Sequence, residues 1–356
     1  MIRQGSLIPV LLVFILIILS IGTLHAAPSE QDWHKLNNAV VKQHILPRYE
    51  ALAKSSAHLA QTVEGYCSQQ QTIDAAQNAF IDAFSQWQTI QHIQFGPVTL
   101  LMRNHSLQYW PDKKNTGARQ LRAVLSGSDT AFNESFFRQA SISLKGFPAL
   151  ERVLFDMITP LQPASKPCRL ASAIAANIHQ LSEGTLSDWQ AESQAIKDAG
   201  NNDLYESADE AATELMKSLV EPIEAIRDSK ILRPLGDKPS KTNWKRSESW
   251  RSKRSIANLS INLSTLQHLY SGTQDSNTKA LLAVEDATLA ESIDRQFSAL
   301  LNKLQHIPEV ENTLVSDNQR ARLIEVASDL KHLHVDLEQA MALLNIQLGF
   351  NSRDGD

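Results

Sequence analysis

The chain has 356 residues, with 34 Lys and Arg against 39 Asp and Glu, and only 2 Cys. This length suffices for one large or two modest domains with a sizeable apolar core. A formal net charge of −5 disfavours a basic nucleic-acid-binding protein, and 13 Gly with 13 Pro exclude a collagen-like or low-complexity chain. Composition therefore predicts a helix-rich globular protein that does not bind nucleic acid.

The first 26 residues have the order of a secretory signal peptide. Arg3 is the only Lys, Arg, Asp or Glu among them, and an apolar run of about 15 residues extends from Leu7 to Ile21. Such a run is short for a membrane span, which needs about 20 residues. We predict a signal peptide at residues 1–26 that is cleaved after Ala26, export to the periplasm or cell envelope, and no stable membrane span thereafter. An uncleaved N-terminal anchor is the alternative.

Helical periodicity dominates the rest of the chain. Apolar residues recur at spacings of three and four, with polar residues opposite, and convincing period-two runs are absent, which is typical of helices packed in bundles. The clearest runs lie at residues 73–90, 289–304 and 323–348. We predict an all-α fold with an N-terminal helical bundle at 27–195 and a C-terminal helical bundle at 196–356.

The two cysteines gain a meaning from export, because exported chains pair cysteines more often than cytosolic ones. Cys67 ends a predicted helical segment, and Cys168 opens another after Pro167. Backbones can meet at such ends, so we predict a Cys67–Cys168 disulfide. Two buried free thiols are the alternative.

Two segments of the N-terminal half carry candidate site residues. Arg103 and Asp112 flank a loop, because Pro111 disfavours helix in the residue before it. Further along, Gly146 permits a turn before a helix, and we expect Glu151 in the first turn of that helix, where the helix dipole favours a carboxylate. Simple helix-start chemistry is the alternative for Glu151.

The segment Glu248–Ser255 concentrates three cations and three hydroxyls before an apolar helix. The spacing of Arg251, Arg254 and Ser255 predicts that they share a helix face. That face could bind an anion or pair with a buried carboxylate such as Glu151. A solvated basic face is the alternative.

Known catalytic and metal motifs are absent from the sequence. The 11 His form no HExxH, and GxSxG, P-loop and GxGxxG patterns do not occur. His334 and Glu338, four residues apart, could share a metal ion, but such pairs more often form a solvated face. No catalytic residue is predicted from these patterns.

Six segments follow one another along the chain: His44–Leu52, Gly96-Pro97, Trp110-Pro111-Asp112, Gly146–Glu151, Arg233–Gly236 and Glu248–Ser255. In this order they resemble the imelysin family. The resemblance covers about residues 34–346 and implies two up-and-down helical bundles packed around a pseudo-two-fold. It also implies an exported protein of a Gram-negative cell envelope, often linked to iron uptake.

The resemblance also bears on catalysis, because founding members were described as metallopeptidases with the signature GxHxxE. Gly146 and Glu151 match this signature, but Pro148 stands where the family has its His. Proline has no side-chain donor atom, so Glu151 alone is left as a candidate ligand for iron or another divalent metal. The departure argues against peptidase activity.

The resemblance therefore predicts a ligand-binding or iron-uptake-related accessory protein, with a site at the interface of the two bundles. Its ligand would be a small polar or anionic molecule or a metal chelate. A metal-dependent peptidase is one alternative, and a structural protein that binds partners in the envelope is another. The residues predicted to converge at the site are Glu151, Arg103, Asp112, Arg251, Ser252, Arg254 and Ser255.

Overall fold

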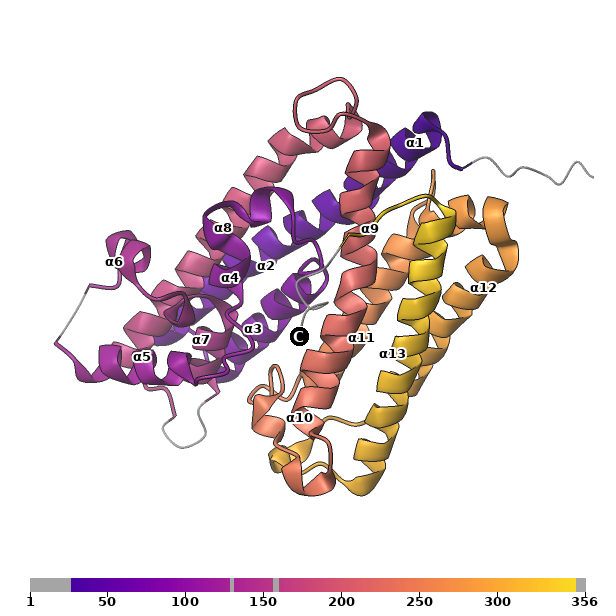
Figure 1. The fold of residues 1–356 in the computed structure, drawn as a ribbon. Helices are drawn as coiled ribbons and strands as arrows, with labels where there is room; N and C mark the ends of the chain where they lie inside the picture. The colour runs from indigo at the N-terminus through magenta and orange to yellow at the C-terminus, as the bar shows by residue number, and fades with distance from the viewer. Residues whose placement is uncertain (1–26, 129–130, 156–159, 350–356) are drawn as a thin grey trace, which may run out of the picture.

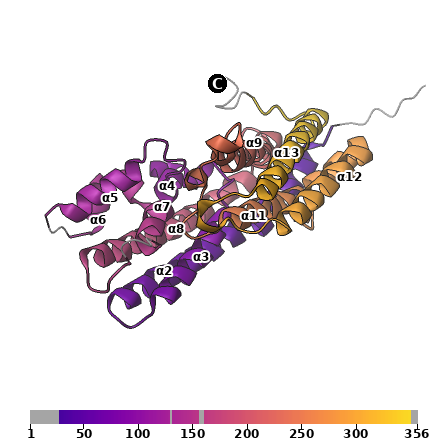
Figure 2. The same cartoon turned by 90° about the horizontal axis from the view of Figure 1, so that it is seen from below.

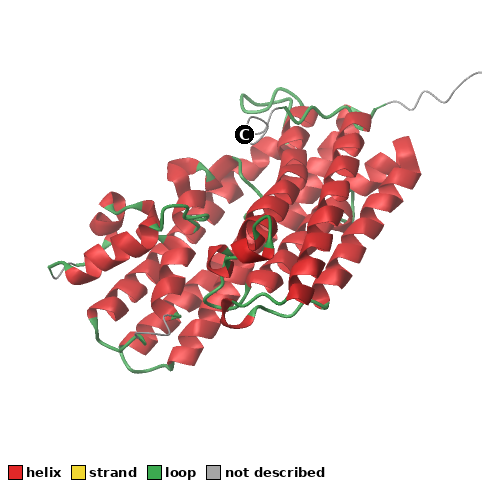
Figure 3. Cartoon of the chain, turned by 60° about the horizontal axis from the view of Figure 1, so that its bottom comes forward, coloured by secondary structure: helices red, strands yellow, loops and turns green. Residues whose placement is uncertain are grey.

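The structure is a computed structural model that describes residues 27–128, 131–155 and 160–349. The predicted signal peptide, at residues 1–26, lies outside the described residues. Within these ranges the chain forms helices, turns and loops and no strand, as Figure 3 shows. The predicted all-α class is confirmed. No helix in the described part of the chain is long and apolar enough to cross a membrane.

The first bundle is built on three long helices, with shorter helices between the second and the third (Figure 1). Helix α2 packs against both α3 and α8, and α7 packs against α8 and α3. The long helices are α2 (Leu46–Cys67), α3 (Ile73–Gln88) and α8 (Lys166–Lys197); the short ones are α4 (Arg103–Leu107), α5 (Thr116–Ser126), α6 (Glu134–Gln139) and α7 (Gly146–Leu154).

The apolar stripe of α3 shows why this bundle forms. Thr72 caps the helix, its hydroxyl accepting a hydrogen bond from the backbone N–H of Ala75 at 3.1 Å. Phe80, Phe84 and Trp87, spaced by four and three residues, are all buried. They lie on one face of the helix, so the stripe read from the sequence is the face that enters the core.

The second bundle lies beside the first, as Figure 2 shows from below. Its α12 packs against α11 and α13, and α13 packs against α9. Its helices are α9 (Ala208–Glu224), the short α10 (Arg233–Leu235), α11 (Ser255–Gln267), α12 (Thr278–Gln305) and α13 (Asp317–Leu343).

The first helix of the chain, α1 (Glu30–Val40), packs mainly on α9. The buried Asn37 amide donates a hydrogen bond to the carbonyl oxygen of Ala208, the first residue of α9, at 2.8 Å. Helix α1 therefore joins the second bundle in space, although it precedes the first bundle in sequence. The predicted division between residues 195 and 196 falls in the last turn of α8.

Cys67 and Cys168 form a disulfide, with their Cα atoms 5.6 Å apart. Cys67 is the last residue of α2, and Cys168 lies in the first turn of α8. The predicted pairing is confirmed, and so is its reason, because two helix ends meet at this point.

The disulfide is expected to stabilise the protein through the unfolded state. It closes a loop of about 100 residues, which in the chain-entropy model corresponds to at most about 4–5 kcal/mol. The Cys67→Ala/Cys168→Ala variant should therefore unfold at a lower urea concentration than the oxidised protein. The oxidised protein treated with reductant should approach the variant, and equal midpoints with and without reductant would contradict a stabilising bridge.

Three segments are π-helical, which the sequence did not predict: η1 (Val41–Ile45), η5 (Ala225–Leu232) and η8 (His268–Gly272). Single π turns inside helices often occur at functional sites. Each of these segments carries an ionisable side chain that faces the contact between the bundles, namely His44, Lys230 and His268.

Candidate functional site

A cavity of about 480 Å³ lies where loops of the two bundles meet; we call it the first cavity. One side is formed by α3, residues 108–118 and α7, and the other by α10 and residues 243–251. Its apolar part is formed by Phe80, Phe84 and Phe147, all buried. The cavity therefore combines residues that are more than 100 positions apart in sequence.

Gly146 allows α7 to approach the chain that leads into this cavity. Its φ of +71° lies in the left-handed region that favours glycine. A Cβ at this position would lie 2.2 Å from the carbonyl oxygen of Leu107 and 2.3 Å from that of Ser106. The close contact fixes the start of α7 against the segment that continues to the cavity wall at Gln108.

Asp112 lines the first cavity but has a structural role there. Its two carboxylate oxygens accept hydrogen bonds from the backbone N–H groups of Thr116, at 2.7 Å, and Gly117, at 2.8 Å. Arg152 lies 3.7 Å from the same carboxylate. Asp112 thus satisfies free N–H groups at the start of α5 and holds the loop that forms this wall.

Glu151 is buried and links the two bundles. One carboxylate oxygen accepts hydrogen bonds from the backbone N–H of Ser252, at 2.9 Å, and from its hydroxyl, at 2.7 Å. Burial raises the pKa of Glu151, against the bonds from Ser252 and the charges of Arg251 and Arg152. The expected first-turn position is wrong: α7 begins at Gly146, so Glu151 lies in its second turn and is held by Ser252 rather than by its own helix start.

Arg251 lines the same cavity as Glu151, so the structure brings these two predicted residues together with Asp112. The Arg251 guanidinium lies over the ring of Trp250, 4.2 Å from its centre, in a cation–π contact. The Lys245 ammonium lies 5.9 Å from the same ring centre. Trp250 therefore gathers two cations at one wall of the cavity.

Positive charge exceeds negative charge around the first cavity. Its lining includes six Lys and Arg against three Asp and Glu. The three acids are already engaged, Asp112 and Glu151 as described and Glu248 by Lys230. The six cations are Lys113, Arg152, Arg233, Lys245, Arg246 and Arg251.

Among these six cations, Arg233 and Arg246 lie close enough together for their charges to interact. Burial lowers the pKa of Arg233, and the like charge of Arg246 lowers it further. Within the described ranges, no ion pair joins either guanidinium to a carboxylate. Two neighbouring guanidinium groups facing a cavity without an acid between them favour an anionic occupant.

Four predicted site residues do not line this cavity. One of them, Ser252, is bonded directly to Glu151, whereas the other three are not. Arg103 pairs with Asp188 on α8 at 2.6 Å. The charge of Arg254 acts on Glu309, where it opposes the rise in the pKa of Glu309 that burial causes. Ser255 donates a hydrogen bond to the carbonyl oxygen of Glu248 at 2.7 Å. Their predicted convergence with Glu151 is wrong.

The reason lies in local backbone structure. Residues 248–253 form a turn, and α11 begins only at Ser255. Helical spacing therefore does not apply to Arg251 and Arg254, and only Arg251 lines the first cavity. Ser252, between them, is the residue that reaches Glu151.

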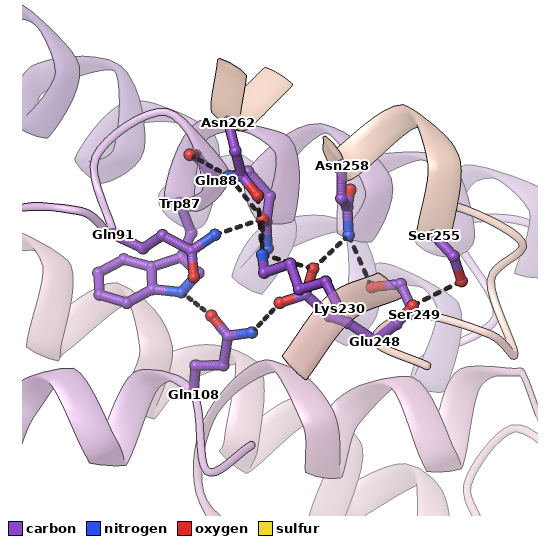
Figure 4. A network of polar contacts seen from close by, with 10 residues as sticks. All are labelled: Trp87, Gln88, Gln91, Gln108, Lys230, Glu248, Ser249, Ser255, Asn258 and Asn262. Carbon is purple, nitrogen blue, oxygen red and sulfur yellow. Dashed lines mark hydrogen bonds and ion pairs between the residues drawn. The ribbon is translucent and has the colours of Figure 1, made fainter. Parts of the chain in front are cut away.

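A buried polar network next to the cavity was missed by the sequence reasoning (Figure 4). The Lys230 ammonium donates hydrogen bonds to Gln88 at 3.0 Å, Glu248 at 3.0 Å and Asn262 at 2.8 Å. The other oxygen of Glu248 accepts a hydrogen bond from Gln108. Burial lowers the pKa of Lys230, and the charge of Glu248 opposes this shift. A single lysine in an apolar helical pattern gives no signal that would have revealed this pair.

Glu151 does not fit the role of a metal ligand. Its nearest charges are the cations Arg152 and Arg251, and one of its oxygens is bonded twice by Ser252. No group of three or more His, Cys, Asp or Glu side chains that could hold a metal ion occurs in the described part of the chain. Pro148, at the position of the family His, lines the first cavity.

A second cavity, of about 520 Å³, lies on the other side of the segment 108–111. Gln108, Trp110 and Pro111 line both cavities, so this segment forms the partition between them. The second cavity is further lined by residues of α9 and η5 and by His92. It too lies between the two bundles.

Comparison with known proteins places this geometry in context. The family model described as Imelysin matches residues 45–337. The crystal structure of an imelysin-like protein from Psychrobacter arcticum 273-4 superposes on this fold with a TM-score of 0.77. The two sequences are 20% identical, and the match covers 91% of this chain and 99% of that protein's chain.

A second crystal structure is that of a protein from Parabacteroides distasonis ATCC 8503, named as an iron-regulated protein A precursor. Its sequence is 16% identical to this one, and the TM-score of the two structures is 0.61. The match covers 90% of this chain and 95% of that protein's chain. At these identities the two likenesses show the fold alone. A search of curated proteins found no match.

Proposed function

The chain belongs to the imelysin family, and from this premise we propose that it is an exported, non-catalytic protein of the cell envelope that binds a small anionic ligand or an anionic metal chelate. The proposed site is the first cavity, at the contact between the two bundles. Concave sites of several hundred Å³ between two structural units are a usual position for small ligands.

The observation that carries the proposal is the pair Arg233 and Arg246 at the wall of this cavity. The two positive charges repel each other. The acids that line the cavity are bonded to other groups, namely the start of α5, Ser252 and Lys230. An anion between the two guanidinium groups would relieve their repulsion and accept hydrogen bonds from both. The buried phenylalanines opposite would contact an apolar part of the ligand.

Export and a link to iron complete the proposal. Export is supported by the charged, apolar and small-residue order of the first 26 residues. The Parabacteroides neighbour is named as a precursor and as iron-regulated, which supports an accessory role in iron uptake for this chain. Ferric chelates with carboxylate ligands are anions that an excess of positive charge would attract.

Binding of phosphate, citrate and ferric citrate to the full chain, measured by titration calorimetry, tests this function. At least one of these anions should bind. The Arg233→Gln/Arg246→Gln variant should bind it about 100-fold more weakly or worse, since each of the two lost charged hydrogen bonds contributes about 1.5–3 kcal/mol. The control Arg295→Gln/Lys331→Gln removes two exposed charges from α12 and α13 and should bind as the wild type does. Equal affinity in both double variants would place the anion elsewhere.

The metallopeptidase alternative makes a different prediction. It requires cleavage of peptides that stops when a chelator is added and is lost in Glu151→Ala. Pro148 and the cations around Glu151 argue against that outcome. Chelator-sensitive cleavage by the purified full chain would replace the binding function with a catalytic one.

A further inference from the structure

Three histidines form a chain at the contact between the bundles, away from the first cavity. His44 lies in η1, His92 follows α3, and His268 lies in η8. The Nε2 atoms of His44 and His92 are 2.8 Å apart, and the Nδ1 atoms of His44 and His268 are 3.1 Å apart. His44 therefore uses both ring nitrogens and joins the loop after α3, in the first bundle, to η8 in the second.

The surroundings of the three rings disfavour positive charge. His44 is completely buried, His92 is 7% exposed, and His268 is half-buried. Arg48, on α2, donates a hydrogen bond to the carbonyl oxygen of His44 at 3.0 Å. Asp275, after η8, is bonded to Gln43, and no ion pair joins any of the three rings to a carboxylate in the described chain.

The arrangement does not suit a single metal ion. An imidazole binds one ion through one nitrogen, whereas His44 directs its two nitrogens to different partners. Two N–H···N hydrogen bonds between neutral rings account for both short contacts. The three rings therefore have the geometry of a hydrogen-bonded chain rather than that of a chelating site.

The number of protons on the chain decides whether both contacts survive. Three neutral imidazoles carry three N–H groups on six nitrogens, and each N···N contact needs one of them. The third proton lies on an outer nitrogen, Nδ1 of His92 or Nε2 of His268. A fourth proton fills the other outer nitrogen and leaves both contacts intact. A fifth puts two N–H groups face to face, so that one contact must break.

We propose that His44, His92 and His268 form a proton-sensitive latch between the two bundles, closed while the chain of rings holds at most one excess proton and opened by the second. His92 and Leu266, two residues before His268, line the second cavity. Opening of the latch would therefore alter the wall of that cavity. The latch does not depend on the anion proposed for the first cavity.

Electrostatics sets the direction of the switch. Burial and the charge of Arg48 lower the pKa of His92 to about 3 and lower the pKa values of His44 and His268. The unfolded pKa of histidine is about 6.5, so the open or unfolded protein binds more protons in acid than the closed one. Closure is therefore favoured above about pH 6.5 and is lost as the pH falls below that value.

Hydrogen exchange of residues 41–45 and 268–272 in the full chain, corrected for the pH dependence of intrinsic exchange, tests the latch between about pH 8 and pH 4. Opening by two protons should reduce protection by up to about 100-fold per pH unit, tenfold for each proton. His44→Phe keeps a ring but removes both contacts, and its protection should change tenfold or less per pH unit. The control His332→Phe, at an exposed position of α13, should follow the wild type. A wild-type protection independent of pH, or an equal slope in His44→Phe, would overturn the proposal.

The nitrogen-15 NMR spectrum of the wild-type histidines provides a second test that needs no folded variant. At about pH 7.5, His44 should show one protonated and one bare ring nitrogen, and both should have the shifts of hydrogen-bonded atoms. A His44 ring with both nitrogens protonated, or with neither nitrogen hydrogen-bonded, would also overturn the proposal.

Discussion

Lys230→Met is expected to destabilise the protein by about 3–5 kcal/mol, because it leaves Glu248 buried without its counter-charge. Lys230 and Glu248 have side chains only 9% and 4% exposed, and their charged atoms are 3.0 Å apart. Glu248→Gln should have a similar effect, since the Lys230 ammonium would then keep only the neutral acceptors Gln88 and Asn262. Urea unfolding near neutral pH measures both changes.

The double variant Lys230→Met/Glu248→Gln separates a paired charge from two independent contributions. Removing both charges leaves no buried ion, so the double variant should lose less stability than the sum of the two single losses. The exposed Lys303, paired with Glu325 and Asp329, gives a control, because Lys303→Met should cost about 1 kcal/mol or less. Additive losses within about 0.5 kcal/mol would show that the pair is not coupled.

Gly146→Ala is expected to cost about 2–5 kcal/mol. A left-handed backbone costs an alanine about 1–2 kcal/mol, and forcing extra atoms into a packed site adds about 1–3 kcal/mol. The new methyl group would overlap the carbonyl oxygens of Ser106 and Leu107, which are backbone atoms with little freedom to move. Urea unfolding of the variant measures the loss.

Gly349 provides a matched control for this substitution. It has the same φ of +71°, but a Cβ there would meet nothing within 4 Å. Gly349→Ala therefore reports the backbone preference alone and should cost no more than about 1–2 kcal/mol. If both variants lose equal stability, the close contact at Gly146 does not constrain the fold.

The helices could be predicted from local apolar patterns, and the disulfide from the expected export of a chain with only two cysteines. The apolar stripe of α3 is visible at spacings of three and four residues, and the cysteines lie at helix ends. The π-helical segments could not be predicted, because nothing in their composition distinguishes them from ordinary helix. Two of them, η1 and η8, carry His44 and His268, which contact each other although they are 224 positions apart in sequence.

The candidate site could be predicted only in part, because its residues come together through tertiary packing. Glu151 and Arg251 do line one cavity, but the prediction relied on helical spacing for Arg254, which follows a turn. Arg103 was predicted at the site because Asp112 is close to it in sequence. In the structure it instead pairs with Asp188 on α8. Arg233 lay within a segment already singled out by the family resemblance, and its proline-flanked position could have marked it as a site residue.

The most direct test of the proposed binding function is a crystal structure of the full chain with whichever of phosphate, citrate or ferric citrate binds most tightly. The account predicts the anion in the first cavity, within hydrogen-bond distance of Arg233 and Arg246, with the Glu151–Ser252 bonds intact. An anion bound outside this cavity, with Arg233 and Arg246 facing an empty space at saturating concentration, would contradict it.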